Sequence, residues 1–226
     1  FNANMLANEM FLDSSSIRSS VVSHAKTLGY VPISSRCPVA TVDISLNTSS
    51  LANATMPAGT IFNSSVGGTS YQFVTATDRT SSNIGATIPY RNTKIYEGTF
   101  VSTRYTVDTS TADQRFIITD NRADTSTLTV KVQTSSGNTT VTSFTEATDI
   151  TQLTSTSNVY FLQEVESAKF EVYFGDGIIG TALSDDNIVI LTYVVGNRED
   201  ANGASIFTNS ASIAGVNDVA VATIDV

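Results

Sequence analysis

From residue 39 onward, apolar and polar residues alternate along the chain, and this pattern limits the fold more than any other feature. Successive side chains of a β-strand point to opposite faces, so an alternating segment predicts a half-buried strand. In VATVDISL at 39–46, one face holds Ala40, Val42, Ile44 and Leu46. Further strand-like segments lie at 56–62, 66–78, 94–108, 114–121, 127–144, 158–174 and 187–195. We therefore predict a mainly β fold, made of two or more small β-sandwich-like or mixed β subdomains.

Turn-forming residues separate these strands. The pair Pro57 and Gly59, the pair Gly67 and Gly68, and the segment SSGN at 135–138 each mark a tight turn. The segment NIVILTYVV at 187–195 is apolar on both faces, which is typical of a central strand. By contrast, DRTSSNIGATIPYRN at 78–92 is polar, and we expect it to be a connection.

An N-terminal helical segment is expected in residues 1–30, the one region with a helical period. Its apolar residues Met10, Ile17, Val21 and Leu28 recur at three- to four-residue steps with wider gaps, which predicts a stripe along a helix. The stripe either packs on the chain's own sheet or docks on a helix of a partner, and the sequence leaves both open. We take these four residues as a candidate partner-helix interface.

Capping residues predict where this helical segment breaks and ends. Asp13 and Ser14 are good N-cap residues, so we expect them to divide the region into two helices. Lys26 then falls in the last turn and Gly29 follows as a C′ residue. Pro32 prevents the helix from continuing.

The composition excludes several classes of protein. A net charge of −9 repels phosphates, so we expect no nucleic-acid partner. No apolar run approaches the roughly 18 residues of a membrane-spanning helix, and no basic region followed by an apolar one predicts a signal peptide. We therefore expect no membrane partner. The chain opens on Phe1 rather than Met, so we expect a piece of a longer protein.

Few residues suit nucleophilic catalysis or metal binding. His24 is the only histidine and Cys37 the only cysteine. No serine stands in a G-x-S-x-G elbow, and Cys37 has no basic neighbour except Arg36 to lower its pKa. Zinc needs more nitrogen and sulfur ligands than one histidine and one cysteine supply. We predict no enzyme, no catalytic residues, no metal site and no cofactor.

Paired carboxylates, as in glycoside hydrolases, would be the remaining route to catalysis. The candidates are Asp176, Asp185, Asp186, Glu164 and Glu166. Glu164 and Glu166 fall on one face of a predicted strand close to a lysine, which is typical of a solvated surface. The chain also lacks tryptophan, the usual stacking platform of a sugar cleft.

The sequence FGDG at 174–177 is predicted to be a structural turn rather than a metal site. Gly175 and Gly177 tolerate positive φ, and Asp-Gly is a strong tight-turn pair. A calcium loop would place oxygen ligands at alternate positions, whereas FGDG offers the single carboxylate of Asp176. The segment SDDN at 184–187 is predicted to be a second turn.

These elements predict four successive regions. The N-terminal helical segment covers 1–32, a first β domain covers 33–109 and a second covers 110–200. Residues 201–226 are expected to begin a further subdomain or arm.

Several segments, in this order along the chain, carry motifs that belong together in one protein family. Residues 8–40 pair F-L-D-x-x-x-x-R-x-x-V with A-K-x-x-G-Y-x-P, and MPAGTIF carries P-A-G-T. The segments 97–108 and 113–132 resemble the strands that follow. FEVYFGDGIIGTAL and GNREDANGASIF are similar to the F-G-D-G turn and a G-x-x-x-x-A-N-G segment. The motif residues of the first block are Phe11, Leu12, Asp13, Arg18, Val21, Ala25, Lys26, Gly29, Tyr30 and Pro32. With these motifs the chain resembles the baseplate wedge proteins of T-even-like contractile-tailed phages, the baseplate J-like family.

The resemblance implies a structural protein without catalytic residues. Such a wedge subunit pairs with itself and joins other wedge and tail proteins into a ring around the tail hub, which rearranges when the sheath contracts. Its location would be the tail baseplate of the virion, and the host cytoplasm during assembly.

Two other functions remain open from the sequence. A carbohydrate- or receptor-binding β module of a phage fibre or surface adhesin would share the Ser-, Thr- and Asn-rich strands but would not need the N-terminal helix. A glycoside-cleaving tail enzyme would act through Asp176 and a partner such as Asp185.

Overall fold

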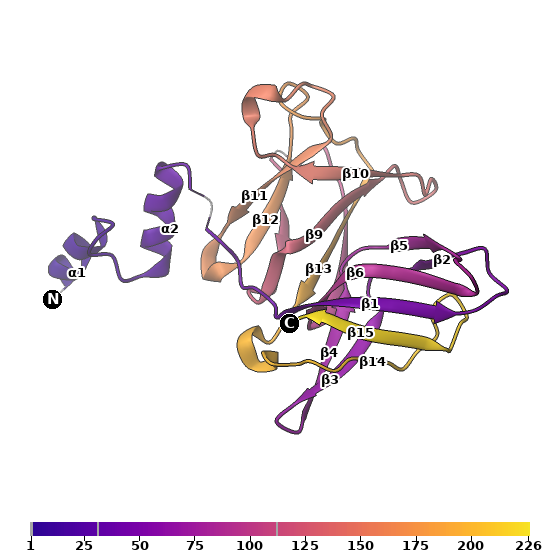
Figure 1. Ribbon diagram of the computed structural model, residues 1–226. Helices are drawn as coiled ribbons and strands as arrows, with labels where there is room; N and C mark the ends of the chain where they lie inside the picture. Colours follow the sequence, from indigo (N-terminus) through magenta and orange to yellow (C-terminus); the bar gives the residue numbers. More distant parts are fainter. Residues whose placement is uncertain (1, 31, 112) are drawn as a thin grey trace. The chain divides into compact units, whose positions relative to one another are not determined.

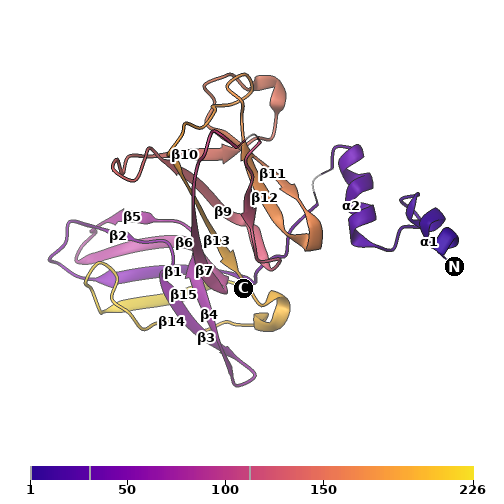
Figure 2. The same ribbon diagram turned by 180° about the vertical axis from the view of Figure 1, so that it is seen from behind.

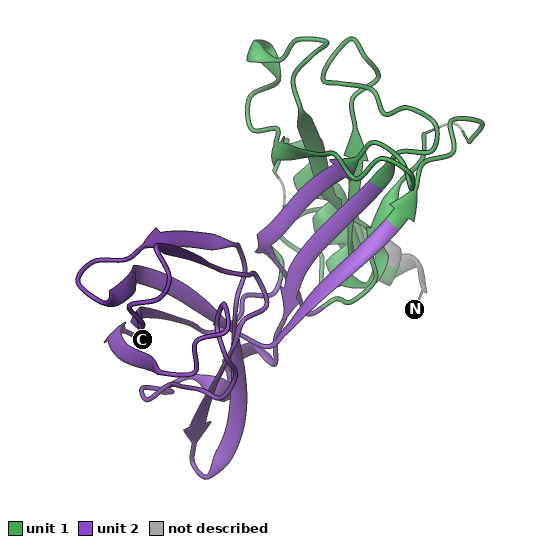
Figure 3. Cartoon of the chain, turned by 90° about the vertical axis from the view of Figure 1, so that its right-hand side faces the viewer, with its two compact units in different colours: residues 1–34, 105–121, 133–188 green, residues 35–104, 122–132, 189–226 purple. Residues whose placement is uncertain are grey.

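The computed structural model describes residues 2–30, 32–111 and 113–226, and its fold is mainly β with two helices at the N-terminus (Figure 1). The predicted fold class is confirmed. The chain forms two compact units (Figure 3): unit 1 holds residues 1–34, 105–121 and 133–188, and unit 2 holds residues 35–104, 122–132 and 189–226. Each unit is built from separate segments of the chain. The four successive domains expected from the sequence stay a prediction.

The N-terminal segment forms helices α1 (Asn2–Glu9) and α2 (Arg18–Thr27). The expected break is present, but the predicted N-cap at Asp13 or Ser14 is wrong, because Ile17 precedes α2 without a side-chain cap. The Ser14 hydroxyl donates instead to the carbonyl of Asn8 at 2.6 Å. The Glu9 carboxylate instead accepts the N–H groups of the two residues that precede α2, Ser16 at 3.0 Å and Ile17 at 3.2 Å.

The C-terminus of α2 ends as the sequence predicts. Gly29 has a φ of +77°, which glycine adopts without steric cost. Its N–H donates to the carbonyl of Lys26 at 3.0 Å, and the N–H of Tyr30 reaches Ala25 at 2.9 Å. This pair of bonds satisfies the last carbonyls of the helix.

Unit 2 is built on a six-stranded sheet with the order β14-β3-β4-β6-β1-β15, whose pairs are antiparallel. Strand β1 confirms the predicted alternation, because Ala40, Val42, Ile44 and Leu46 are buried. The predicted turns at 57–59 and 67–68 connect β2 (Asn53–Met56) to β3 and β3 to β4. The strands of this sheet are β1 (Val39–Asn47), β3 (Ile61–Val66), β4 (Thr69–Thr75), β6 (Thr87–Glu97), β14 (Thr208–Asn209) and β15 (Val219–Asp225).

The segment 78–92, predicted to be a polar connection, contains strands, and that prediction is wrong. Strand β5 (Arg79–Ser82) pairs with β2 (Asn53–Met56) in a separate two-stranded sheet. Strand β6 begins at Thr87. The side chains of β5 are exposed or half-buried, so no apolar alternation marks it in the sequence.

Buried aromatic and aliphatic residues from several strands form the core of unit 2. Phe73 of β4 packs edge to face on Phe207, with ring centroids 4.9 Å apart. Residues 201–226, expected to begin a further subdomain or arm, thus contribute Phe207, β14 and β15 to this unit. The largest fully buried side chains of this core include Phe62, Ile88, Tyr90 and Ile95.

Unit 1 contains four neighbouring strands in the order β10-β11-β12-β8. They are β8 (Phe116–Ile118), β10 (Val141–Glu146), β11 (Val159–Glu164) and β12 (Phe170–Phe174). The pair β10 and β11 is parallel, whereas β12 is antiparallel to both of its neighbours. Phe174 packs edge to face on Phe116 and on Phe144, with centroids 5.6 and 5.2 Å apart. Short 3-10 turns occur at Ile150–Gln152, Glu166–Ala168 and, in unit 2, Arg198–Ala201.

Three further strands are β7 (Thr99–Thr106), β9 (Ala123–Gln133) and β13 (Ile188–Val195). In unit 2 they adjoin in the order β7-β13-β9, and β7 is labelled in the view from behind (Figure 2). The central position predicted for β13 is confirmed, since it lies between β7 and β9, and Val189 and Leu191 are fully buried. No helix in the described part of the chain is long and apolar enough to cross a membrane.

Candidate functional site

The loop that holds FGDG uses the carboxylate of Asp176 to fold itself. Asp176 Oδ1 accepts the N–H groups of Ile178 at 2.9 Å and Ile179 at 3.1 Å. These two bonds favour the charged form and lower the pKa of Asp176. The carboxylate is therefore occupied by the backbone of its own loop.

Both glycines of FGDG are required by the backbone. Gly177 has a φ of +86°, a conformation that favours glycine. A Cβ on Gly175 would lie 2.2 Å from the carbonyl oxygen of Ile179, closer than any real contact. The backbone conformation of the loop therefore accounts for the two glycines of FGDG.

Asp185, the suggested partner of Asp176 in catalysis, is also occupied. Its Oδ1 accepts the N–H of Thr109 at 3.0 Å and the Thr109 hydroxyl at 3.2 Å. The general acid of a glycoside hydrolase needs a raised pKa, whereas the pKa of Asp176 is lowered. The geometry therefore gives no support to a pair of catalytic carboxylates here.

A cavity of about 380 Å³ borders the FGDG loop in unit 1. The Arg115 guanidinium lies 4.3 Å from the centroid of the Tyr173 ring. The same guanidinium is 3.6 Å from the carboxylate of Glu171. The cavity wall also includes Asp108 and Asp176, so it combines a cation with carboxylates. The Tyr173 ring is itself covered, since Arg115 lies over it and the Phe161 ring stacks on it with centroids 5.1 Å apart. Sequence reasoning did not single out Arg115 or Tyr173.

The histidine and the cysteine have structural contacts. His24 Nε2 lies 2.9 Å from the carbonyl oxygen of Glu9, which links α2 to α1. Cys37 is buried, and this burial, followed by the charges of Asp124 and Glu97, raises its pKa to about 12. Within residues 2–30, 32–111 and 113–226, no group of three or more His, Cys, Asp and Glu side chains could hold a metal ion.

The candidate partner-helix interface lies mostly at the ends of the two helices. Met10 follows α1, Ile17 directly precedes α2, Val21 lies within α2 and Leu28 caps its C-terminus. Met10 is 69% exposed, Ile17 39% and Leu28 74%, and Val21 is half-buried. The buried residue of α2 is instead Val22. These exposures do not fit a stripe packed on the chain's own sheet, and docking on a partner stays a proposal.

Glu164, predicted to be solvated, is buried, and that prediction is wrong. Its carboxylate accepts two hydrogen bonds from Arg18, at 2.8 Å from Nε and 2.9 Å from Nη2. Lys26 Nζ donates to the carbonyl oxygen of the same residue. A buried carboxylate requires such partners, and no local sequence signal links Arg18 to a residue so far along the chain. Glu166 is exposed, as expected.

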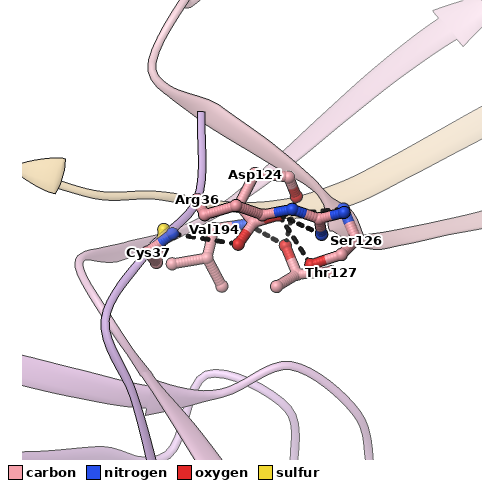
Figure 4. Close-up of polar contacts among 6 residues, drawn as sticks. All are labelled: Arg36, Cys37, Asp124, Ser126, Thr127 and Val194. Carbon is pink, nitrogen blue, oxygen red and sulfur yellow. Dashed lines mark hydrogen bonds and ion pairs between the residues drawn. The ribbon is translucent and has the colours of Figure 1, made fainter. Parts of the chain in front are cut away.

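In unit 2 a second buried carboxylate, Asp124, anchors the segment that leads into β1 (Figure 4). Asp124 accepts the N–H of Cys37 at 3.0 Å and a hydrogen bond from Arg36 Nη1 at 3.2 Å. It also accepts the N–H and the hydroxyl of Ser126, at 2.9 and 2.6 Å. The Thr127 hydroxyl donates to the Asp124 carbonyl and accepts the N–H of Val194 at 2.9 Å. One polar cluster thus joins β9, β13 and the entry to β1.

Glu97, at the end of β6, is a third buried carboxylate. It accepts the N–H and the side-chain amide of Asn197, both at 2.8 Å. The neighbouring Gly196 lies close to Cys37, and a Cβ added to Gly196 would be 2.6 Å from Cys37 Sγ. These buried charges are held by hydrogen bonds and stabilise a fixed arrangement of strands.

The comparison with known families agrees with a structural role. Residues 101–210, just under half of the chain, match the family model of the third domain of bacteriophage baseplate wedge protein gp6. This segment runs from β7 to β14 and includes FGDG, Asp124 and Glu164. No curated protein matches the chain. The match supports a baseplate wedge family, a structural role in a phage tail baseplate and contact with other baseplate proteins.

Proposed function

We propose that this chain is a structural subunit of a phage tail baseplate wedge, of the T-even-like, baseplate J-like kind. It self-associates and joins neighbouring wedge subunits into a ring around the tail hub. In that position it takes part in assembly and in triggering sheath contraction. The match of residues 101–210 to a wedge protein domain is the observation that carries the proposal.

The arrangement of polar and apolar residues suits this role. Buried carboxylates at Asp124, Glu97 and Glu164 fix strands and chain segments in place. Exposed apolar side chains at Met10, Ile17 and Leu28 supply a surface for a neighbouring helix. Mechanically, rigid β units set the spacing of subunits, and the helical segment joins them.

Electron microscopy of tails tests the proposed location. An antibody raised against this chain is applied to phage particles that carry the protein. We expect label at the baseplate end of the tail and on free baseplates. Label confined to fibres, or to the head, would reject the wedge role.

A carbohydrate-binding module is the second candidate, and the cavity beside FGDG is the observation that favours it. Polar and charged side chains bind sugar hydroxyl groups through hydrogen bonds, and the cavity offers Asp108, Gln114 and Arg115 for such bonds. A glycan array separates the two functions. Saturable binding of one saccharide class, abolished by Gln114→Ala, would favour this candidate over the wedge role.

A further inference from the structure

Helix α2 makes little apolar packing contact with the rest of unit 1. A groove of about 570 Å³ separates it from the end of β11. Ile17, just before α2, and Val22 of α2 line one side of this groove, and residues 164–168 line the other side. Val22 is the one buried residue of α2, and apolar stabilisation scales with the area removed from water. Something other than packing must therefore hold the helix.

Two basic side chains of α2 hold the helix in place through hydrogen bonds to β11. Arg18 and Lys26 lie two turns apart on α2, and both donate to Glu164 of β11. Arg18 is 56% exposed, whereas Glu164 is 2% exposed, so the carboxylate depends on a cation that water also reaches. A two-pronged bond between guanidinium and carboxylate is among the stronger polar contacts in proteins. Removing the charge of either Arg18 or Glu164 breaks this ion pair.

The other wall of the groove is a strained turn. Ser167 and Ala168, which follow β11, have φ angles of +62° and +58°. Left-handed backbone is unfavourable for residues with a Cβ and persists only where neighbouring contacts hold it. Here the N–H of Val165 donates to the carbonyl of Lys169 at 2.8 Å and closes the turn. Strain of this kind is common at parts of proteins that change conformation.

We propose that Glu164, Arg18 and Lys26 form a clasp that holds α2 on β11 and lets the helical segment leave as a unit. Within that segment, Glu9 and His24 tie α1 to α2 and would remain in place. Release uncovers Val22 beside the apolar stripe and enlarges the surface for a neighbouring subunit. This use in assembly rests on the proposed function, whereas the clasp itself does not.

Hydrogen exchange of the full 226-residue chain tests the clasp. An isolated helix as short as α2 is marginal in water, so a released α2 exchanges its amides faster. Glu164→Gln and Arg18→Gln are compared with Arg91→Gln, which removes a cation paired with Asp43 at 3.2 Å in unit 2. We expect the amides of 21–28 to exchange at least about tenfold faster in the first two variants. The amides of β1 should keep their wild-type exchange rates in Glu164→Gln and in Arg18→Gln.

Two results would overturn the clasp. One is exchange in α2 that stays within about twofold of wild type in both Glu164→Gln and Arg18→Gln. The other is an equal increase in Arg91→Gln. If Glu164→Gln loosens the whole chain, Arg18→Gln decides, because its side chain is largely in water.

Sedimentation of the same variants keeps the clasp and the function apart. Faster α2 exchange with stronger self-association supports both. Faster exchange with no change in sedimentation supports the clasp and counts against its use in assembly.

Discussion

The carboxylate of Asp124 accepts the backbone N–H of Cys37 at 3.0 Å, although 87 residues separate the two positions. The same carboxylate accepts from Arg36 and twice from Ser126. Because Asp124 is buried, water cannot replace these bonds when the carboxylate is lost. The entry to β1 therefore depends on one side chain of β9.

Replacing Asp124 by alanine should strongly destabilise the chain. We expect Asp124→Ala to lower the free energy of unfolding by about 3 kcal/mol, because buried donors lose their acceptor. Asp43→Ala is the control, since Asp43 pairs with the exposed Arg91 and accepts the N–H of Asn92 where water also reaches. Water can replace these contacts, so the cost should be about 1 kcal/mol. Urea denaturation measures both, and equal losses would contradict the anchor role of Asp124.

The FGDG loop should tolerate no side chain at its first glycine. In Gly175→Ala the new Cβ would meet the carbonyl of Ile179, so we expect a loss of about 3 kcal/mol. Gly137→Ala is the matched control, because no atom lies within 4 Å of its Cβ position and its φ is not positive. A thermal melt compares the two. Similar melting temperatures of Gly175→Ala and Gly137→Ala would contradict the prediction that the loop excludes a side chain at Gly175.

The strained turn after β11 should be relieved by glycine. We expect Ser167→Gly to raise the free energy of unfolding by about 1 kcal/mol, since its φ of +62° disfavours a Cβ. Ser143→Gly in β10 should instead lose about 0.5–1 kcal/mol, because glycine weakens an ordinary strand. Chemical denaturation of the two variants gives the sign of each change in the free energy of unfolding. A loss at Ser167 would contradict the strain.

Cys37 should be unreactive in the folded chain at pH 8. Burial raises its pKa to about 12, so the thiolate is scarce. Because the folded pKa exceeds the unfolded value of 9.0, the unfolded thiol loses its proton first as the pH rises. The contribution of Cys37 to stability is thus present below pH 9 and lost between about pH 9 and 12.

Two measurements check this titration. A thiol reagent should modify Cys37 in urea but spare it in buffer, and Cys37→Ala should lose less stability than wild type across that alkaline range. Modification of the folded chain at the unfolded rate would contradict the burial.

Much of the fold is predictable from the sequence where side chains alternate clearly. In β1 the period of two fixes which face is buried, and Gly67 and Gly68 fix the turn between β3 and β4. The start of β6 is not predictable, because Pro89 lacks the N–H that a central strand uses. In the structure Pro89 lies opposite Ser45 of β1, whereas the other neighbour, β4, pairs with β6 only at Ile95–Glu97 and does not reach Pro89.

The buried charges are much harder to predict. Glu164 and Asp124 have the same local context as solvated acidic residues, and their partners Arg18 and Arg36 lie far away in the sequence. Only the folded chain brings each pair together. The segments of units 1 and 2 interleave along the chain, and this arrangement depends on long-range strand pairing such as β1 with β15.

Sedimentation velocity over a wide concentration range tests the central claim, a structural subunit that self-associates through its helical segment. We expect a dimer or larger closed species that persists at moderate salt, since apolar contacts are not screened. Leu28→Ser should weaken this species at least about tenfold. Ile206→Ser, at a residue 76% exposed against 74% for Leu28, should leave it unchanged. Folded monomers at every concentration, or equal weakening by both substitutions, would contradict the account.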